Sequence, residues 1–153
     1  MAERDGDGWV ECTCGHRHWG KNGAAGLLLI REGKVLLQHR APWVHNGDTW
    51  GIPGGARDSH ETIEEAAFRE AREEIGLNTE TLTTLHEHEV NHEIWSYHTV
   101  IAHVHEDLGD LTLNEECVTV EWVEYADVEK KALHPSFAQA WPALLTRLRE
   151  LAI

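Results

Sequence analysis

The sequence is short of cysteine, of basic residues and of long apolar runs, and each shortage excludes a class of protein. It has three cysteines, two of them one residue apart, which disfavours a disulfide framework and favours a reducing compartment. Lys and Arg number 13 against 27 Asp and Glu, a formal net charge of −14, so an extended nucleic-acid partner is not expected. No apolar run approaches the ~20 residues of a membrane span, and the N-terminus does not resemble a signal peptide. We therefore expect a cytoplasmic protein without membrane contact.

Acidic residues are instead concentrated in one predicted helix. Thr62 followed by Glu65 has the form of a capping box, and Gly76 suits a left-handed helix end. At about 100° per residue, three glutamates share one face and the neighbouring face is apolar. These glutamates are Glu70, Glu73 and Glu74.

Like charges at this spacing repel one another, and the C-terminal half of a helix disfavours anions further. A bound cation would reverse both effects. Carboxylate oxygens without neighbouring thiolates suit a hard ion, so the pattern indicates Mg²⁺ or Mn²⁺. A solvated acidic face is the simpler interpretation of any glutamate-rich helix.

The spacing around this helix favours the metal site, because residues 55–77 resemble the Nudix box. That motif has a glycine, five residues, Glu, seven residues, and then Arg-Glu-apolar-x-Glu-Glu-x-Gly-apolar. The matching positions here are Gly55, Glu61, Arg69, Glu70, Ala71, Glu73, Glu74, Gly76 and Leu77.

Membership of the Nudix family implies an α/β fold, with a mixed β-sheet sandwiched between α-helices. It also implies Mg²⁺-dependent hydrolysis of a nucleoside diphosphate linked to another group X. By position, Glu70, Glu73 and Glu74 would bind the metal, Arg69 would orient the glutamates, and Glu73 and Glu74 would be catalytic. We expect residues 23–153 to form this domain and residues 1–22 to be a separate N-terminal segment, with a homodimer as one possible assembly.

Several residues outside the helix are candidates for the substrate. In the family, the loop 41–49 and the turn at Gly54 and Gly55 approach the substrate phosphates, and Arg40 could contact them or be an exposed arginine. Trp95 and Tyr97 could form a flat wall for a base or simply pack. An additional glutamate often joins the family's metal site or acts as base, and Glu115, Glu116 or Glu121 could serve; Glu116 is our choice.

Cysteine and histidine alternate at the N-terminus, where Cys12, Cys14, His16 and His18 could bind Zn²⁺. If this stretch is extended, the four side chains lie on one side of a strand and do not surround an ion, unless Gly15 bends the chain. The alternative is a half-buried strand with ordinary thiols.

Alternating and apolar runs predict the sheet, and a helical period predicts a last helix. The strands are expected at 24–30, 34–39, 81–90, 94–105 and 117–123, and the helix at 136–151 with Pro142 in its first turn or at a kink.

Among Nudix hydrolases, the small size and the Trp50-to-Gly55 stretch favour a MutT-like nucleoside triphosphate pyrophosphohydrolase acting on a small nucleotide. NADH, nucleotide sugars, dinucleoside polyphosphates and capped RNA ends are alternative substrates. A nucleotide sensor without hydrolysis is a different class, disfavoured by the intact box. A prenyl diphosphate isomerase using Cys14 or Cys117 is a third.

Overall fold

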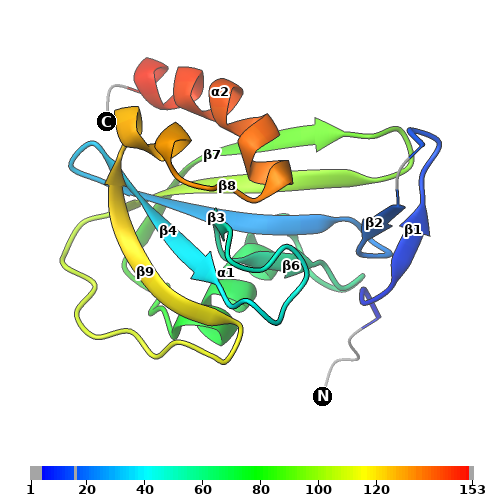
Figure 1. The fold of residues 1–153 in the computed structure, drawn as a ribbon, viewed down its shortest axis with the longest axis horizontal. Helices are drawn as coiled ribbons and strands as arrows, with labels where there is room; N and C mark the ends of the chain where they lie inside the picture. Colours follow the sequence, from blue (N-terminus) through cyan, green and yellow to red (C-terminus); the bar gives the residue numbers. More distant parts are fainter. Residues whose placement is uncertain (1–4, 16, 152–153) are drawn as a thin grey trace.

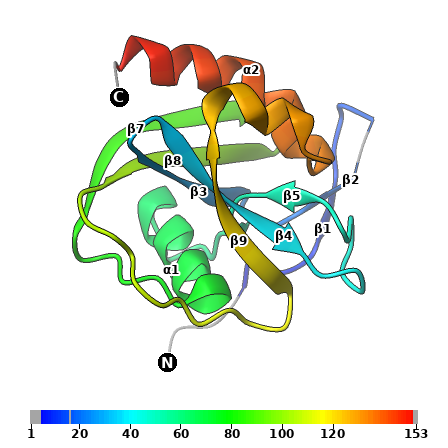
Figure 2. The ribbon, with the colours of Figure 1, turned by 60° about the vertical axis from the view of Figure 1, so that its left-hand side comes forward.

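Seven strands form one mixed β-sheet that lies between two helices (Figures 1 and 2). The computed structural model describes residues 5–15 and 17–151. Helix α1 (Ile63–Ile75) covers one face, and helix α2 (Pro135–Glu150) covers the other. The strands are β3 (Ala24–Arg31), β4 (Lys34–Arg40), β5 (Trp50–Gly51), β6 (Gly54–Ala56), β7 (Leu82–Asn91), β8 (Ser96–Val104) and β9 (Cys117–Glu124), followed by a 3₁₀ helix at Tyr125–Lys130. The expected sandwich is confirmed.

Strand β3 lies in the middle of the sheet, and both of its faces are covered. Leu27 and Leu29 pack with α1, whereas Leu28 and Ile30 pack with α2, and all four side chains are fully buried. An uninterrupted apolar run is the pattern expected of a strand buried on both sides.

One edge of β3 is divided between two partners, and this division creates the site described below. Strand β8 pairs in parallel along Ala24–Ile30. On the opposite edge, β4 pairs only at Ile30 and Arg31, and β6 pairs at Ala24–Gly26. The chain at Gly54–Gly55 thereby enters the middle of the sheet, directly beside α1.

Helix α1 begins and ends where its sequence predicts. The Thr62 side chain accepts from the Glu65 N–H, and the Glu65 carboxylate accepts from the Thr62 N–H. Gly76 has φ of 67°, and its N–H binds the carbonyl groups of Ala71 and Arg72. Both caps satisfy backbone groups that a helix end otherwise leaves unpaired.

Of the two positions predicted for Pro142, the structure excludes the first turn of the last helix. Helix α2 begins at Pro135, so Pro142 lies in its interior and outside the first turn. Pro135 suits the first helical position, where no N–H partner is needed. The buried side chains of Phe137, Trp141 and Leu144, which lie on both sides of the interior proline, pack the helix on the sheet.

The N-terminal cysteines do not lie on one extended strand, so that interpretation is wrong. Residues Trp9–Glu11 (β1) and Arg17–Trp19 (β2) form a separate two-stranded antiparallel sheet, and Cys12–Gly15 form the turn between them. Gly15 has φ of 94° and donates to the Cys12 carbonyl at 3.1 Å, so it supplies the bend. His16 lies outside the described residues.

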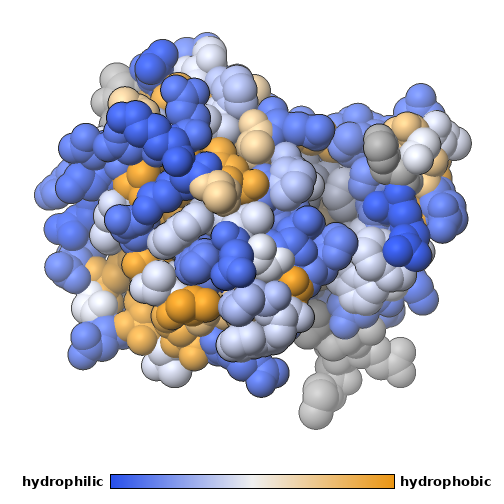
Figure 3. All heavy atoms as spheres, viewed as in Figure 1, coloured by the Kyte–Doolittle hydropathy of each residue, from blue (hydrophilic) through white to orange (hydrophobic). Residues whose placement is uncertain are grey.

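Polar residues dominate the face shown in Figure 3, and hydrophobic residues gather at its lower left. The outline of the molecule also dips between its main body and the hairpin that projects to the right. Within the described part of the chain, no helix has the length and apolar character needed to cross a membrane.

Candidate active site

Two of the three predicted metal ligands are buried carboxylates one turn apart on α1. Glu70 is 8% exposed and Glu74 is 6% exposed, whereas the side chain of Glu73 is 46% exposed. Charged side chains are rarely so buried unless they have partners. The contacts of these carboxylates therefore define the site.

Arg69 contacts four carboxylates and the backbone. Its guanidinium binds Glu61 through Nε at 2.6 Å and Nη2 at 2.8 Å, and Nη2 also donates to the Ala56 carbonyl. Nη1 donates to Glu70 at 2.9 Å and to Glu73 at 3.4 Å. Asp58 lies 3.8 Å away. This geometry is what an arginine that orients the glutamates requires. Glu61 is the motif glutamate that precedes the helix, and Asp58 is a further buried partner that we did not single out from the sequence.

The turn at Gly54 and Gly55 is pressed against the same carboxylates. The Gly54 N–H donates to Glu74 Oε2 at 2.8 Å. A Cβ atom at Gly55 would lie 2.6 Å from Glu70 Oε1, and one at Gly54 would lie 2.7 Å from the Ala25 carbonyl oxygen. Only glycine allows so close an approach, which explains the residue type at both positions.

The site holds more negative charge than its own residues neutralise. Burial, followed by the nearby charge of Glu70, raises the pKa of Glu74 to about 8, and Glu116 adds to the shift. The Gly54 N–H opposes it only in part. Burial, then the charge of Glu74, likewise raises the pKa of Cys117 to about 11. A cation near Glu70 and Glu74 would relieve this repulsion.

The donor set therefore suits a hard divalent ion, with one qualification of geometry. Glu70, Glu73 and Glu74 supply only oxygen atoms, as Mg²⁺ and Mn²⁺ prefer. Among the residues that the structure describes, their oxygen atoms do not form a set within 4.8 Å of one another. Arg69 holds Glu70 and Glu73 in this arrangement, so a shared ion would require those side chains to turn.

The turn that contacts these carboxylates also lines a cavity of about 540 Å³, whose lining includes the predicted substrate residues but none of Glu70, Glu73 and Glu74. Gly54, Gly55, Arg40 and Tyr97 all line it. Arg40 also donates through Nε and Nη2 to the His45 carbonyl, so it fixes the loop 41–49 while it faces the cavity. The Tyr97 hydroxyl lies against Gly26 and Gly54, which leaves this tyrosine packed into the floor of the cavity.

The structure separates the three candidates for an additional glutamate. Glu116 lines the cavity and raises the pKa of Glu74 through its charge, after burial and Glu70. Glu121 pairs with Lys131 and lines a different depression on β9. Glu115 is exposed and outside the cavity lining. Glu116 is therefore the best placed of the three.

The outer wall of the cavity comes from residues that we did not predict. Trp9, Arg17 and Trp19 of the β1–β2 hairpin line it, although they precede the box by more than thirty residues. Arg17 lies over the Trp9 ring at 4.1 Å, and the rings of Trp9 and Trp19 meet edge to face at 5.2 Å. Two tryptophans about 45% exposed are a signal of a binding surface, but the sequence does not show which site they face.

The opposite wall is tied to α2 by a neutral histidine. His134 Nδ1 accepts from the Ser136 N–H at the start of α2, and Nε2 lies 3.2 Å from the Asn46 amide. Burial, followed by the charges of Arg40 and His45, lowers the pKa of His134 to about 4. The unprotonated ring can therefore cap the helix at neutral pH and hold the loop 41–49 beside it.

The predicted N-terminal metal ligands are brought together as far as they are described. Cys12, Cys14 and His18 lie in one cluster, with 3.1 Å between Cys14 Sγ and His18 Nε2. His18 also lines the cavity. Cys117 is buried elsewhere, with its raised pKa keeping it a thiol, which disfavours a cysteine-based isomerase.

Comparison with known proteins agrees with the geometry of the site. The family model described as the NUDIX domain matches residues 20–144. "Putative 8-oxo-dGTP diphosphatase 3" of Mycobacterium tuberculosis is 48% identical, over 93% of this chain and 70% of that protein. "Nucleoside triphosphate pyrophosphatase/Nudix hydrolase fusion protein" of Bifidobacterium longum is 40% identical, over 99% of this chain and 33% of that protein.

A solved structure is similar over nearly the whole chain. The crystal structure of a Nudix hydrolase from M. smegmatis, RenU, is 47% identical and superposes with a TM-score of 0.81, covering 96% of this chain and 95% of that one. The residues that match the family model include the complete motif around α1 and the divided edge of β3, whereas the hairpin residues that line the cavity precede the match. This chain belongs to the Nudix hydrolase family.

Proposed function

We propose that this Nudix hydrolase converts a nucleoside triphosphate to a nucleoside monophosphate and pyrophosphate, with Mg²⁺ or Mn²⁺ as cofactor. The observation that carries the proposal is the placement of Glu70 and Glu74, two buried and mutually repelling carboxylates, against the Gly54–Gly55 turn, which lines a cavity of about 540 Å³. A cavity of this size suits a nucleotide, since small-molecule sites typically enclose about 300–1,000 Å³. An oxidised purine triphosphate is the first substrate to test, because of the name of the M. tuberculosis relative.

Glu70, Glu73 and Glu74 are the residues that would hold the metal. When bound there, a divalent cation supplies positive charge for the phosphate oxygens and lowers the pKa of a coordinated water. Arg69 keeps Glu70 and Glu73 aligned through its contacts at 2.9 and 3.4 Å. Arg40 and the Gly54–Gly55 turn lie where the phosphate chain would run along the cavity.

Hydrolysis needs a base and a leaving group, and the chain offers the base. A water oxygen forms a bond to phosphorus while the bond from that phosphorus to a bridging oxygen breaks, and the water's proton goes to a carboxylate. Glu116 suits this role because it lines the cavity and its charge reaches Glu74. Pyrophosphate leaves with the electron pair of the broken bond.

The nucleobase of the substrate would enter through the aromatic side of the cavity. Trp9, Trp19 and Trp95 all line it, and Trp95 stacks on His18 at 4.2 Å with an interplanar angle of 6°. Stacking of a base on aromatic rings is worth about 1–3 kcal/mol. Trp95 and the two tryptophans of the hairpin therefore form one aromatic wall of the cavity.

Turnover with Mg²⁺ against a panel of triphosphates tests this proposal, with products identified by mass. The panel contains ordinary and 8-oxo-purine nucleotides, dinucleoside polyphosphates, nucleotide sugars and NADH. Monophosphate and pyrophosphate are expected from one triphosphate, and chelation of the metal should abolish them. Release of orthophosphate, preference for another group of substrates, or tight nucleotide binding without turnover would each contradict the proposal.

A further inference from the structure

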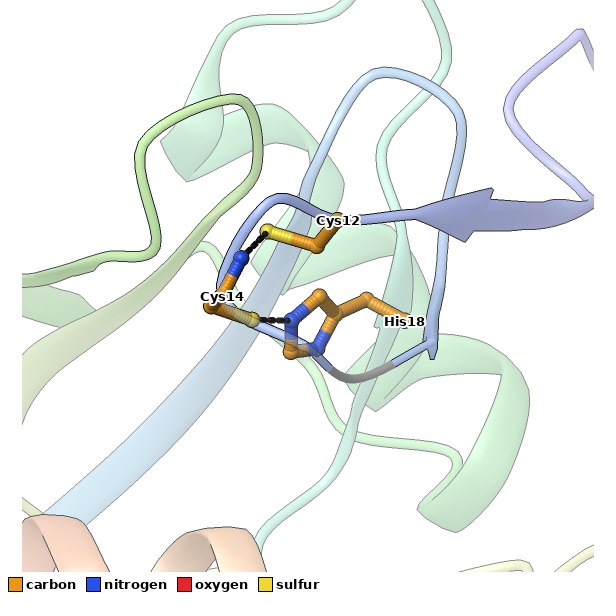
Figure 4. A group of neighbouring side chains, drawn as sticks. All are labelled: Cys12, Cys14 and His18. Carbon is orange, nitrogen blue, oxygen red and sulfur yellow. Dashed lines mark hydrogen bonds between the residues drawn. The ribbon is translucent and has the colours of Figure 1, made fainter.

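The hydrolase site leaves one chemically distinctive cluster unused. Cys12 and Cys14 lie in the turn between β1 and β2, and His18 lies on β2 opposite Val10 (Figure 4). We propose that Cys12 Sγ, Cys14 Sγ and His18 Nε2 bind a Zn²⁺ ion that closes the β1–β2 turn onto strand β2. This is a second metal site, separate from the carboxylates of α1.

The three donor atoms are already close to the spacing that zinc requires. All lie within 4.8 Å of one another, and Cys14 Sγ is 3.1 Å from His18 Nε2. Tetrahedral zinc with bonds of about 2.3 Å to sulfur and about 2.0 Å to nitrogen places its ligand atoms roughly 3.5–3.8 Å apart. Side-chain shifts of about 1 Å would therefore admit the ion, with a fourth position left for water or another donor.

The backbone explains why the donors converge. The turn closes through the Gly15 N–H and the Cys12 carbonyl at 3.1 Å, with Gly15 at φ of 94°. Antiparallel pairing of Glu11 with Arg17 and of Val10 with His18 then returns the chain beside its start. A short hairpin thus presents the two sulfur atoms and the imidazole to one point, as Figure 4 shows.

The surroundings also favour ligation by thiolate and imidazole. The Cys14 N–H points to Cys12 Sγ at 3.5 Å. Stacking on Trp95 fixes the plane of the His18 ring. Two thiolates balance the charge of the ion, and sulfur and nitrogen donors select zinc over Mg²⁺.

The hairpin that zinc would close also contacts a distant part of the chain. The hairpin already contacts the β7–β8 turn, since Cys12 Sγ donates to the His92 carbonyl at 2.7 Å and Trp95 Nε1 donates to the Gly20 carbonyl at 3.0 Å. Loading would replace the Cys12 proton with metal, so the hydrogen bond to the His92 carbonyl would be lost and the ion would hold the turn against β2. Trp9, Arg17 and Trp19 on the cavity wall would be fixed with it.

The metal content of the purified protein tests the site without any activity measurement. E73Q/E74Q protein serves as the background, so that the carboxylates of α1 contribute little, and Zn²⁺ or Co²⁺ is added and then removed by desalting. We expect about one ion per chain, and for Co²⁺ a thiolate charge-transfer band and the intense visible bands of a tetrahedral site. C117S should retain the same metal content per chain, whereas the metal content of C12S/C14S should fall at least tenfold.

Alkylation of the wild-type thiols gives a second reading that does not depend on a variant folding. Zn²⁺ should protect two thiols per chain, and a chelator should expose them again. The proposal is overturned if C12S/C14S and C117S have equal metal content, or if Zn²⁺ protects no thiol. It is also overturned by a mass two hydrogens lower with no metal bound, which a Cys12–Cys14 disulfide would give. A failure of nucleotide hydrolysis would leave these metal readings unchanged, so the two proposals fail separately.

Discussion

Glu74 combines a functional position with a cost in stability. Its carboxylate is buried, it faces the charges of Glu70 and Glu116, and its pKa is raised to about 8. Glutamine at this position could still accept the Gly54 hydrogen bond through its amide oxygen but would bring no charge into the site.

We therefore expect E74Q to lower turnover by roughly 100-fold or more while raising the metal-free melting temperature by a few degrees. Mg²⁺-dependent turnover and thermal unfolding in chelator measure the two effects. The exposed Glu80 supplies the control, and E80Q should change neither quantity. Near-wild-type turnover in E74Q would contradict the assignment of Glu74 to the metal site.

Glu61 has the opposite electrostatic behaviour. Burial alone would raise its pKa, but hydrogen bonds from Arg69 and from the Asp58 N–H outweigh burial and lower it below the ordinary 4.5. A lowered folded-state pKa stabilises the protein above the unfolded value, and that stability is lost as the pH falls through the folded value.

E61Q should accordingly reduce stability at neutral pH by about 2 kcal/mol, or about 4–8 °C in melting temperature. The difference from wild type should shrink as the pH falls below 4.5. Urea unfolding at several pH values measures it. A constant difference from neutral pH to pH 3 would show that the Glu61–Arg69 ion pair is not its source.

At the scale of elements, α2 contains a proline in its interior, where proline destabilises a helix. Pro142 lies in the interior of α2, is exposed, and offers no N–H to the Ala138 carbonyl one turn earlier. An interior proline costs about 3 kcal/mol, of which the stiffer unfolded chain returns about 1.

P142A should therefore raise the melting temperature by about 4–8 °C. P135A is the matched control in the same helix, because the first helical position needs no N–H partner, and it should change the melting temperature little. Differential scanning calorimetry compares them. A loss of stability in P142A would mean that the proline ring makes packing contacts worth more than the missing hydrogen bond.

Elements whose signals are local were predictable from the sequence. The Thr62–Glu65 capping box and Gly76 bound α1 because each cap is made by neighbours in the chain. The hairpin of β3 and β4 has Glu32 and Gly33 at φ of 52° and 75°, the left-handed pair of a tight two-residue turn. The N-terminal cysteine stretch had two interpretations, an extended strand or a bend at Gly15, and the structure has the bend.

Over the whole molecule, the site was predictable only in part. The motif identified Glu70 and Glu74, but the pairing of β6 with β3 that sets Gly54 against Glu74 depends on strands far apart. The wall formed by Trp9 and Trp19 was also inaccessible, since no local pattern tells which distant surface a hairpin will face.

That wall leads to a prediction about substrate binding that rests on the proposed function. Trp19 lines the cavity, and its side chain contacts neither Glu70 nor Glu74 in the interactions described above. W19A should raise KM by about tenfold and change kcat little, because stacking on the base is equal in ground and transition states.

Trp43 is a matched control, because it is 71% exposed and does not line the cavity. Steady-state kinetics on the substrate identified from the panel should find W43A unchanged. An equal effect of both variants, or a fall in kcat without a change in KM, would place the base elsewhere.

The parallel pairing of β3 with β8 also decides when the protein can fold. Its register joins Ala24 to Tyr97 and Ile30 to His103, so the central strand waits for a partner made about seventy residues later. Closing such a long loop is slow, and contacts this distant in sequence are associated with folding in milliseconds to seconds. During synthesis, the apolar run Leu27–Ile30 leaves the ribosome long before β8 exists to pair with it and before α2 exists to cover Leu28 and Ile30. A nascent chain stalled before Ser96 would therefore display its most hydrophobic strand to chaperones, whatever the quality of the helix that follows it.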